Sequence, residues 1–257
     1  METNAEVYSS EQVLRHYATY SDTLQLPESA ILALLQQRLS AMRMLDIGVG
    51  GGRTTAHFAP LVRTYTAIDF SEGMIASCKE KYQTELPAAK FAVCDVRDLS
   101  RFEARAFEFV LFSFNGIDNV SAPERRIVLA EIRRICAPGG IFCFSSHNLQ
   151  YLPAVFKLHL NVHPVRFIRS LIERRSLLRN NRQQINHLAS ANQLVIYDNV
   201  FDFGLYTCYV RPEWQVKQLL EVGFDSVKLF GLYNGNEINV KDYSKSTDPW
   251  IYYFCTS

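Results

Sequence analysis

Four of the twelve glycines in this sequence fall between positions 48 and 52. Glycine has no Cβ, so a glycine-rich backbone can approach a ligand closely, and a helix that follows it offers unpaired N–H groups to a negative group. The cluster comes directly after an apolar run at residues 44–47 that is typical of a buried strand. The pattern therefore predicts a nucleotide-type binding loop at the carboxyl end of this strand.

Two common nucleotide-binding loops do not fit this spacing. A P-loop requires Lys followed by Ser or Thr after its last glycine, whereas Arg53-Thr54 stands there. A dinucleotide fingerprint counted from Gly48 requires a small residue at position 53, where Arg53 would obstruct the packing of helix on strand. The pattern that fits is acidic-x-G-x-G-x-G, which begins at Asp46 and ends at Gly52.

The elements that must position this loop alternate between short apolar runs and amphipathic helical stretches. Strands are expected at 44–47, 65–68, 91–94, 109–113 and 141–144. Continuous apolar strands separated by helices indicate a parallel sheet covered on both faces. The alternation stops between about residues 150 and 211, which we interpret as an insertion. A helix that begins at Pro212 and is closed by Gly223, followed by strands at 227–230 and 250–255, then completes the sheet.

Further candidate ligand-binding residues follow the second, third and fourth predicted strands, where open α/β sheets bind ligands. These residues are Asp69, Phe70, Asp95, Val96, Phe114 and Asn115. Together with the glycine pattern, their order resembles the motifs of the class I S-adenosylmethionine-dependent methyltransferases. The resemblance covers about residues 43–146 and the tail from 212. Cys136-Ala137 departs from the family's more usual Leu-Lys, which affects packing rather than chemistry.

The resemblance implies a role for each matched position. Asp46 orients the glycine loop and the methionine amino group, and Asp69 accepts hydrogen bonds from the two ribose hydroxyls, which suits an acceptor-only carboxylate. Asp95 and Val96 meet the edge of the adenine. The implied cofactor is S-adenosyl-L-methionine, and the expected cofactor-binding residues are Asp46, Gly48, Gly50, Gly52, Asp69, Phe70, Asp95, Val96 and Phe114.

The expected fold is an α/β Rossmann-like sheet of seven strands in the order 3-2-1-4-5-7-6. An N-terminal helical cap is expected at residues 1–42, including a helix from Pro27 to about Met42. The methyltransferase core is expected at 43–149 and 212–257, and an inserted substrate lid at 150–211.

His147 closes the fifth strand at the same sheet edge as the glycine loop. Its imidazole can take a proton from the methyl acceptor, or it can be fixed by backbone hydrogen bonds alone. Asn115 can orient the substrate or cap the next helix, and these two residues are the catalytic candidates. Aromatic faces suit a sulfonium or methylammonium cation. The residues expected to wall the substrate cavity are therefore Tyr17, Tyr20, Tyr206 and Tyr209.

Two features of the insertion carry weaker signals. His159 and His163 share the i, i+4 spacing of metal ligands, but no metalloprotease glutamate accompanies them and Pro164 ends the segment, so we expect no metal. Residues 166–182 hold six arginines and a single acid, Glu173. This run predicts either an amphipathic helix with a basic solvated face or a lid that attracts a carboxylated or phosphorylated substrate.

Composition limits the partners. Lys and Arg number 27 against 26 Asp and Glu, so the formal charge of +1 does not favour nucleic acid. No apolar run is long enough to span a bilayer, and the N-terminus is acidic rather than signal-like. The six cysteines are scattered, which is typical of free thiols in a reducing compartment. We therefore expect a cytoplasmic protein with a small-molecule substrate and no membrane partner, and a homodimer is left open.

The expected function is methyl transfer from S-adenosylmethionine to an N or O atom of a small molecule. One alternative is methylation of a protein or nucleic acid, although no Asn/Asp-Pro-Pro-aromatic tetrapeptide follows the fourth strand. The other alternative is a non-catalytic, cofactor-binding scaffold of the same fold.

Overall fold

The computed structural model describes residues 7, 13, 22–157, 163–198 and 205–257. Of the predicted N-terminal cap, it therefore describes only Val7, Val13 and the residues from 22 onwards. Tyr17, Tyr20 and His159 lie outside the described residues.

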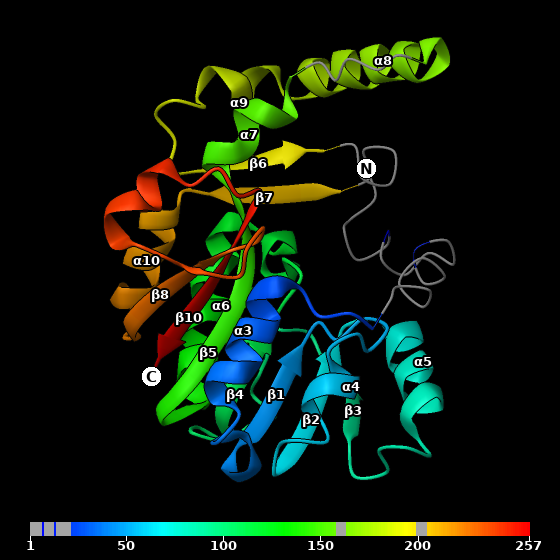
Figure 1. Ribbon diagram of the computed structural model, residues 1–257, viewed down its shortest axis with the longest axis vertical. Helices are drawn as coiled ribbons and strands as arrows, with labels where there is room; N and C mark the ends of the chain where they lie inside the picture. The colour runs from blue at the N-terminus through cyan, green and yellow to red at the C-terminus, as the bar shows by residue number, and fades with distance from the viewer. Residues whose placement is uncertain (1–6, 8–12, 14–21, 158–162, 199–204) are drawn as a thin grey trace.

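A central sheet carries the fold, in the order β3-β2-β1-β4-β5-β10-β8-β9 (Figure 1). Its strands are β1 (Arg43–Ile47), β2 (Thr64–Asp69), β3 (Lys90–Val93), β4 (Phe107–Phe112), β5 (Cys136–Asn148), β8 (Asp225–Gly231), β9 (Glu237–Ile238) and β10 (Trp250–Thr256). The first five pair in parallel, whereas β10 is antiparallel to both β5 and β8. With β8 and β10 as the sixth and seventh strands, the predicted order is confirmed. The described residues add three further strands, β6 (Gln193–Tyr197), β7 (Tyr206–Val210) and β9, to the seven expected.

Helices cover both faces of this sheet. They are α3 (Leu26–Leu35), α4 (Thr55–Phe58), α5 (Glu72–Tyr82), α6 (Ala122–Ile135) and α10 (Pro212–Glu221). Alternate strand residues point to opposite faces, so Leu45 packs with Ile132 of α6 and Met44 packs with Ile31 of α3. Because both faces of the central strands are buried, β4 and the middle of β5 are nearly continuous apolar runs.

Two predicted boundaries are wrong. Helix α3 ends at Leu35, whereas the helix from Pro27 was predicted to reach about Met42, because the chain turns there and a short 3-10 helix, η1 (Leu39–Ala41), brings Leu39 and Met42 into the core. The fifth strand begins at Cys136 rather than 141. Its Pro138-Gly139-Gly140 segment pairs with the chain end, since Gly139 N–H donates to Ser257 O over 2.8 Å.

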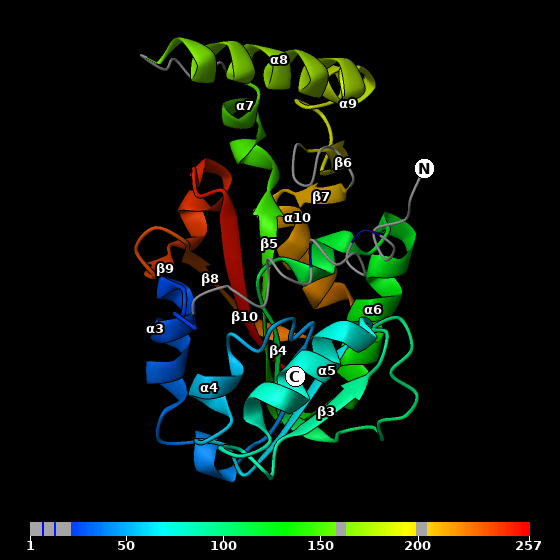
Figure 2. The same ribbon diagram turned by 90° about the vertical axis from the view of Figure 1, so that its right-hand side faces the viewer.

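The insertion is built onto the sheet edge rather than lying apart from it. It contains α7 (Leu152–Val155), α8 (Pro164–Asn180), α9 (Arg182–Asn186) and the β6–β7 hairpin. β7 pairs in parallel with the last two residues of β5, and Leu152, Leu177 and Ile196 form a small separate core. Figures 1 and 2 show α8 outermost at one end of the molecule, beyond β6 and β7.

Candidate functional site

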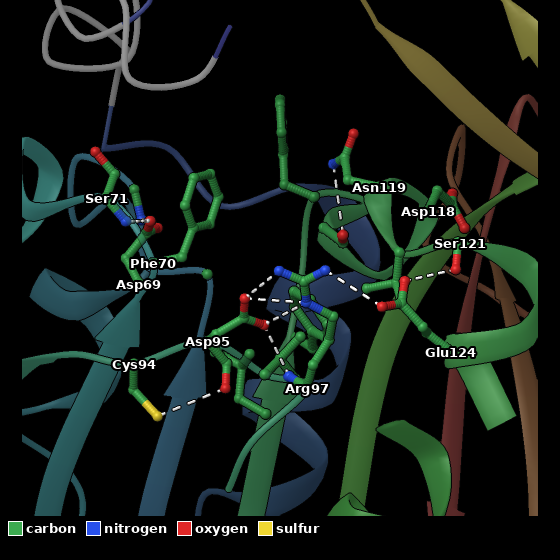
Figure 3. Close-up of a pocket in the computed structure, with 18 of the residues that line it drawn as sticks. Asp69, Phe70, Ser71, Cys94, Asp95, Arg97, Asp118, Asn119, Ser121 and Glu124 are labelled. Carbon is green, nitrogen blue, oxygen red and sulfur yellow. Dashed lines mark hydrogen bonds and ion pairs between the residues drawn. The ribbon is translucent and has the colours of Figure 1, made fainter. Parts of the chain in front are cut away.

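A cavity of about 800 Å³ lies at the carboxyl ends of the parallel strands (Figure 3). One wall, the glycine-loop wall, is formed by residues 47–50 and 69–74, and the opposite wall, the Asp118 wall, by residues 116–124. Residues 94–97 lie between the two walls, and the β6–β7 hairpin contributes Val195 and Tyr206. The predicted site residues that line this cavity are Gly48, Gly50, Asp69, Phe70, Asp95, Val96, Phe114 and Tyr206.

Asp69 ties the glycine loop to the end of β2. Its Oδ2 accepts from the N–H of Gly50 and its Oδ1 from the N–H of Ser71, each over 2.9 Å. Gly50 has φ +52°, which a residue with a Cβ rarely adopts. Burial raises the pKa of Asp69, and the N–H bonds act against that rise. A carboxylate offers about four acceptor positions, so capacity remains for hydroxyls of a ligand in the cavity.

Asp46 supports the loop from behind and does not line the cavity. Its Oδ2 accepts from the Thr54 hydroxyl over 2.5 Å and from the Tyr65 hydroxyl over 2.7 Å. The side chain is wholly buried, which raises the pKa of Asp46 to about 6 despite both hydrogen bonds. In this structure Asp46 therefore contacts Thr54 and Tyr65 behind the loop and does not contact the cavity.

Gly52 also faces away from the cavity. Its φ is +81°, and a Cβ there would lie 2.5 Å from the ring of Tyr82 on α5. The Tyr82 hydroxyl donates to Gly52 O over 2.7 Å. Gly52 is thus required for the close approach of α5 to the loop.

Asp95 is already engaged by a neighbouring side chain. Both of its carboxylate oxygens accept from the Arg97 guanidinium, at 2.6 to 3.0 Å. Arg97 also reaches Glu124 over 3.3 Å, so a chain of charges crosses the space between the walls (Figure 3). Partial burial acts to raise the pKa of Asp95, but the Arg97 contacts outweigh it and lower the pKa.

The Asp118 wall rests on a buried charged network. The Asp118 side chain is 1% exposed and pairs with Arg125, 0% exposed, over 2.8 Å. Arg125 also donates to Gln215 on α10 over 2.6 Å and to Ser146 on β5 over 2.9 Å. This network joins α6, α10, β5 and the 3-10 helix η2 (Gly116–Asn119) at one point.

His147, Asn115 and Tyr209 do not line the cavity but lie behind the Asp118 wall. The Nδ1 atom of His147 is 2.8 Å from Asp118 Oδ2, which also accepts from the His147 backbone N–H over 2.6 Å. The Nε2 atom of His147 is 3.5 Å from Asn115 Nδ2, and the Tyr209 ring centroid is 4.8 Å from the imidazole. Asn115 Oδ1 is buried without a hydrogen-bond partner among the described residues. Whether His147 and Asn115 act in catalysis stays a prediction.

Arg53 is held by a second buried ion pair. Its guanidinium contacts Glu28 of α3 at 2.5 and 2.6 Å, and the Glu28 side chain is fully buried. The Tyr252 hydroxyl donates to the same carboxylate over 2.8 Å. Arg53 also lies 5.1 Å from the Phe114 ring centroid, beside a small hollow between the glycine loop and Phe114. The first turn of α3 is thereby fixed to the loop.

The described residues hold neither a metal-ligand cluster nor a helix able to span a membrane. Over the ranges described, three or more metal-ligating side chains nowhere gather in one place. Within those ranges, the helices also fall short of the length and apolarity needed to cross a membrane.

Comparison with known proteins assigns the family of the core. Residues 44–140 match a family model described as "Methyltransferase domain". Residues 44–140 of this chain are a class I S-adenosylmethionine-dependent methyltransferase domain. The predictions of that family and of S-adenosylmethionine as the cofactor of the domain are thereby confirmed.

One curated relative is the probable phthiotriol/phenolphthiotriol dimycocerosates methyltransferase 2 of Mycobacterium ulcerans. It is 30% identical over 116 residues, which span 43% of this chain and 41% of that protein. The chain matches less than half the length of this relative and of the other curated relatives that it resembles.

Two solved structures share the methyltransferase fold over nearly the whole chain. An S-adenosylmethionine-dependent methyltransferase from Clostridium acetobutylicum has a TM-score of 0.62 at 12% identity, covering 98% of this chain and 96% of that one. The 1,6-didemethyltoxoflavin-N1-methyltransferase of Burkholderia thailandensis, with 1,6-didemethyltoxoflavin and S-adenosylhomocysteine bound, has a TM-score of 0.58 at 14% identity, covering 90% of this chain and 78% of that one.

The motifs of the methyltransferase domain did not disclose every residue around the cavity. Asp118 and Arg97 line it, yet neither was predicted. The sequence held a signal for Asp118, because it follows the fourth strand by only six residues, at the edge where ligands bind. It held no comparable signal for Arg125 and Glu28, which reach the site only through tertiary contacts.

Proposed function

We propose that this chain transfers a methyl group from S-adenosylmethionine to an N or O atom of a small molecule. The observation that carries the proposal is the cavity of about 800 Å³ between the glycine-loop wall and the Asp118 wall. Cofactor and substrate sites commonly enclose ~300–1,000 Å³, so this cavity has room for a nucleoside cofactor with an acceptor beside it.

The residues of the glycine-loop wall suit the cofactor. Asp69 presents a carboxylate with spare acceptor capacity, and Gly48 and Gly50 let the backbone approach without side chains. Asp95 fits less simply, because an adenine amine would have to share its carboxylate with Arg97. We expect Asp69 to contribute more to cofactor affinity than Asp95.

The chain's own residues have to align the acceptor with the methyl group and exclude water from the cavity. S-adenosylmethionine, when bound, supplies a methyl group on a positively charged sulfur, which is already a strong electrophile. The apolar part of the cavity surface includes Phe70, Phe112, Phe114, Val120 and Val195. Such side chains exclude water and favour an uncharged acceptor that is partly apolar.

Removal of the acceptor's proton is assigned to His147, whose imidazole lies behind the Asp118 wall, so the acceptor has to reach past that wall to meet it. Asp118 lies within hydrogen-bond distance of Nδ1, which leaves Nε2 as the nitrogen able to take a proton. An acceptor hydroxyl requires such a base, whereas an amine that arrives neutral does not. The Burkholderia protein is named for N1-methylation of 1,6-didemethyltoxoflavin and the Mycobacterium protein for methylation of phthiotriol or phenolphthiotriol dimycocerosates, and both names support a small-molecule acceptor.

The test is product formation. The full chain, supplied with S-adenosylmethionine and a panel of phenols, hydroxylated lipids and heteroaromatic amines, should give a methylated product by mass spectrometry. His147→Ala should lower kcat by ~10²–10⁴-fold for a hydroxyl acceptor, with His187→Ala as the control. A change below about threefold, with cofactor binding intact, would contradict the base and favour N-methylation. Methylation of protein or nucleic acid alone would favour a macromolecular substrate. The absence of product from every acceptor tested would favour a non-catalytic, cofactor-binding scaffold.

We also propose that residues 150–211 act as the substrate lid. Val195 and Tyr206 of the hairpin line the cavity, and the helices α7 to α9 lie beyond it. Trypsin, which has six arginines available between residues 166 and 182, should cut this segment more slowly when cofactor and acceptor are bound. Equal cleavage with and without saturating ligands would argue that the segment is not a lid.

A further inference from the structure

Helix α8 exposes apolar side chains on its outer surface. The exposed fractions are 67% for Val165, 56% for Ile168, 40% for Leu171 and 62% for Ile172. A contiguous apolar surface of this kind marks a place where a partner binds more often than scattered single residues do.

The helix period separates this surface from the face that holds α8 to the protein. Leu177 is buried in the small core of the insertion, and Arg174 donates to Phe156 O over 3.0 Å, so these residues mark the packed face. Positions 165, 168 and 172 follow the i, i+3, i+7 spacing and fall opposite the packed face. We call Val165, Ile168 and Ile172, with Leu171 at their edge, the outer apolar face.

Positive charge flanks the outer apolar face and continues it toward the end of α8. Arg166, Arg169, Arg175 and Arg179 are exposed on the same helix, and Glu173, paired with Arg169 over 2.8 Å, is its one acid. The remainder of the sequence is close to neutral overall, so this charge is local to α8. A basic rim around an apolar face complements an anionic, partly apolar surface.

The position of α8 allows contact with a flat surface. In both views the helix lies across one end of the molecule's long axis, with the rest of the fold on its inner side (Figures 1 and 2). A plane laid against the outer apolar face would therefore meet the helix along its length before it met the sheet or the cavity.

We infer that α8 is a membrane-surface helix, which docks on a bilayer that contains anionic lipid. Its outer apolar face enters the boundary between headgroups and acyl chains, and its arginines contact lipid phosphates. A second copy of this chain is the less favourable occupant, because pairing two such helices would bring their arginines together. The inference revises the expectation of no membrane partner, which rested on the lack of a spanning segment.

The test is co-sedimentation of the full chain with vesicles. The protein should bind vesicles of phosphatidylcholine mixed with phosphatidylglycerol, and bind much less to phosphatidylcholine alone or at high salt. Ile168→Glu/Ile172→Glu should weaken binding by at least ~10-fold, since two apolar side chains no longer enter the boundary. The matched control is Ile127→Glu/Leu220→Glu, which alters residues 58% and 52% exposed on α6 and α10 and should bind as the wild type does.

A second pair of variants tests the charge. Arg175→Glu/Arg179→Glu should weaken binding to anionic vesicles, whereas Arg63→Glu/Arg126→Glu, at exposed positions off α8, should not. The inference is wrong if the wild type does not bind anionic vesicles, or if the α8 variants bind like their controls. A dimer by light scattering that only Ile168→Glu/Ile172→Glu dissociates, without vesicle binding, would assign α8 to self-association. Methyl transfer is not measured, so the outcome is separate from that of the proposed function.

Discussion

The two walls of the cavity are held in place by partners at very different distances along the chain. On the glycine-loop wall, Asp69 accepts from Gly50 and Ser71, which are 19 and 2 residues away. On the Asp118 wall, Arg125 reaches Gln215 across 90 residues. A wall built from near neighbours leaves a pattern in the sequence, whereas a wall built from distant partners does not. The glycine-loop wall was therefore predictable as a motif, and the network behind the Asp118 wall was not.

The largest effect should come from the long-range network. Arg125→Ala would leave Asp118 buried without its guanidinium partner, so we expect the free energy of unfolding to fall by ~3–5 kcal/mol. Urea denaturation followed by circular dichroism measures this. Arg126→Ala, at the exposed neighbouring position, should change stability by less than ~0.5 kcal/mol. Similar small losses for both variants would mean that the network does not hold the Asp118 wall.

The glycine-loop wall should be sensitive to pH instead. The pKa of Asp46 is about 6 in the folded chain against a usual value of 3.8, so the folded state binds this proton more tightly than the unfolded chain does. Protonation of Asp46 therefore stabilises the folded chain by about 3 kcal/mol below pH 4. This stabilisation is lost as pH rises through 6.

Asp46→Asn should remove this slope, because an amide does not titrate and its oxygen can still accept from Thr54 and Tyr65. Urea denaturation of the wild type and the variant, at several values between pH 4 and 7.5, measures the difference. Asp225→Asn, at an exposed position, serves as the control. Parallel curves for the wild type and Asp46→Asn would contradict the assignment of this pH dependence to Asp46.

The carboxylates of Asp69 and Asp95 should contribute differently to cofactor affinity. Asp69→Ala should weaken S-adenosylmethionine binding by ~1.5–3 kcal/mol, through the loss of charge-assisted hydrogen bonds. Asp95→Ala should cost ~0.5–1.5 kcal/mol, since its carboxylate already contacts Arg97. Calorimetry on the folded variants measures both. An equal or larger loss for Asp95→Ala would reverse the assignment.

The smallest effect should come from the neutral contact that supports the glycine loop. Tyr82→Phe removes a hydroxyl that donates to Gly52 O, and we expect a loss of ~0.5–1.5 kcal/mol in unfolding free energy. Tyr233→Phe, at a tyrosine that is 63% exposed, should leave stability unchanged within ~0.5 kcal/mol. No difference between the two variants would mean that α5 does not stabilise the loop through this hydroxyl.

Comparison of the predicted and observed site shows which inferences a motif can support. Gly48, Gly50, Asp69, Phe70, Asp95, Val96 and Phe114 line the cavity as expected at the edge of a parallel sheet. Asp46 and Gly52 belong to the same motif, but they contact Tyr65 and Tyr82 rather than the cavity. A motif identifies a type of loop, and the side chains packed behind the loop determine which of its residues line the cavity.

The sequence by itself determined the alternation of strands and helices and the glycine loop, and its resemblance to the methyltransferase family implied the strand order. Apolar periodicity and glycine placement act over a few residues, and they are the same in any chain that carries them. Tertiary structure alone decided that β7 joins β5, that Asp118 contacts His147 and Arg125, and that α8 turns an apolar face outward. These outcomes depend on which distant segments meet, and that is fixed only when the whole chain packs into one core.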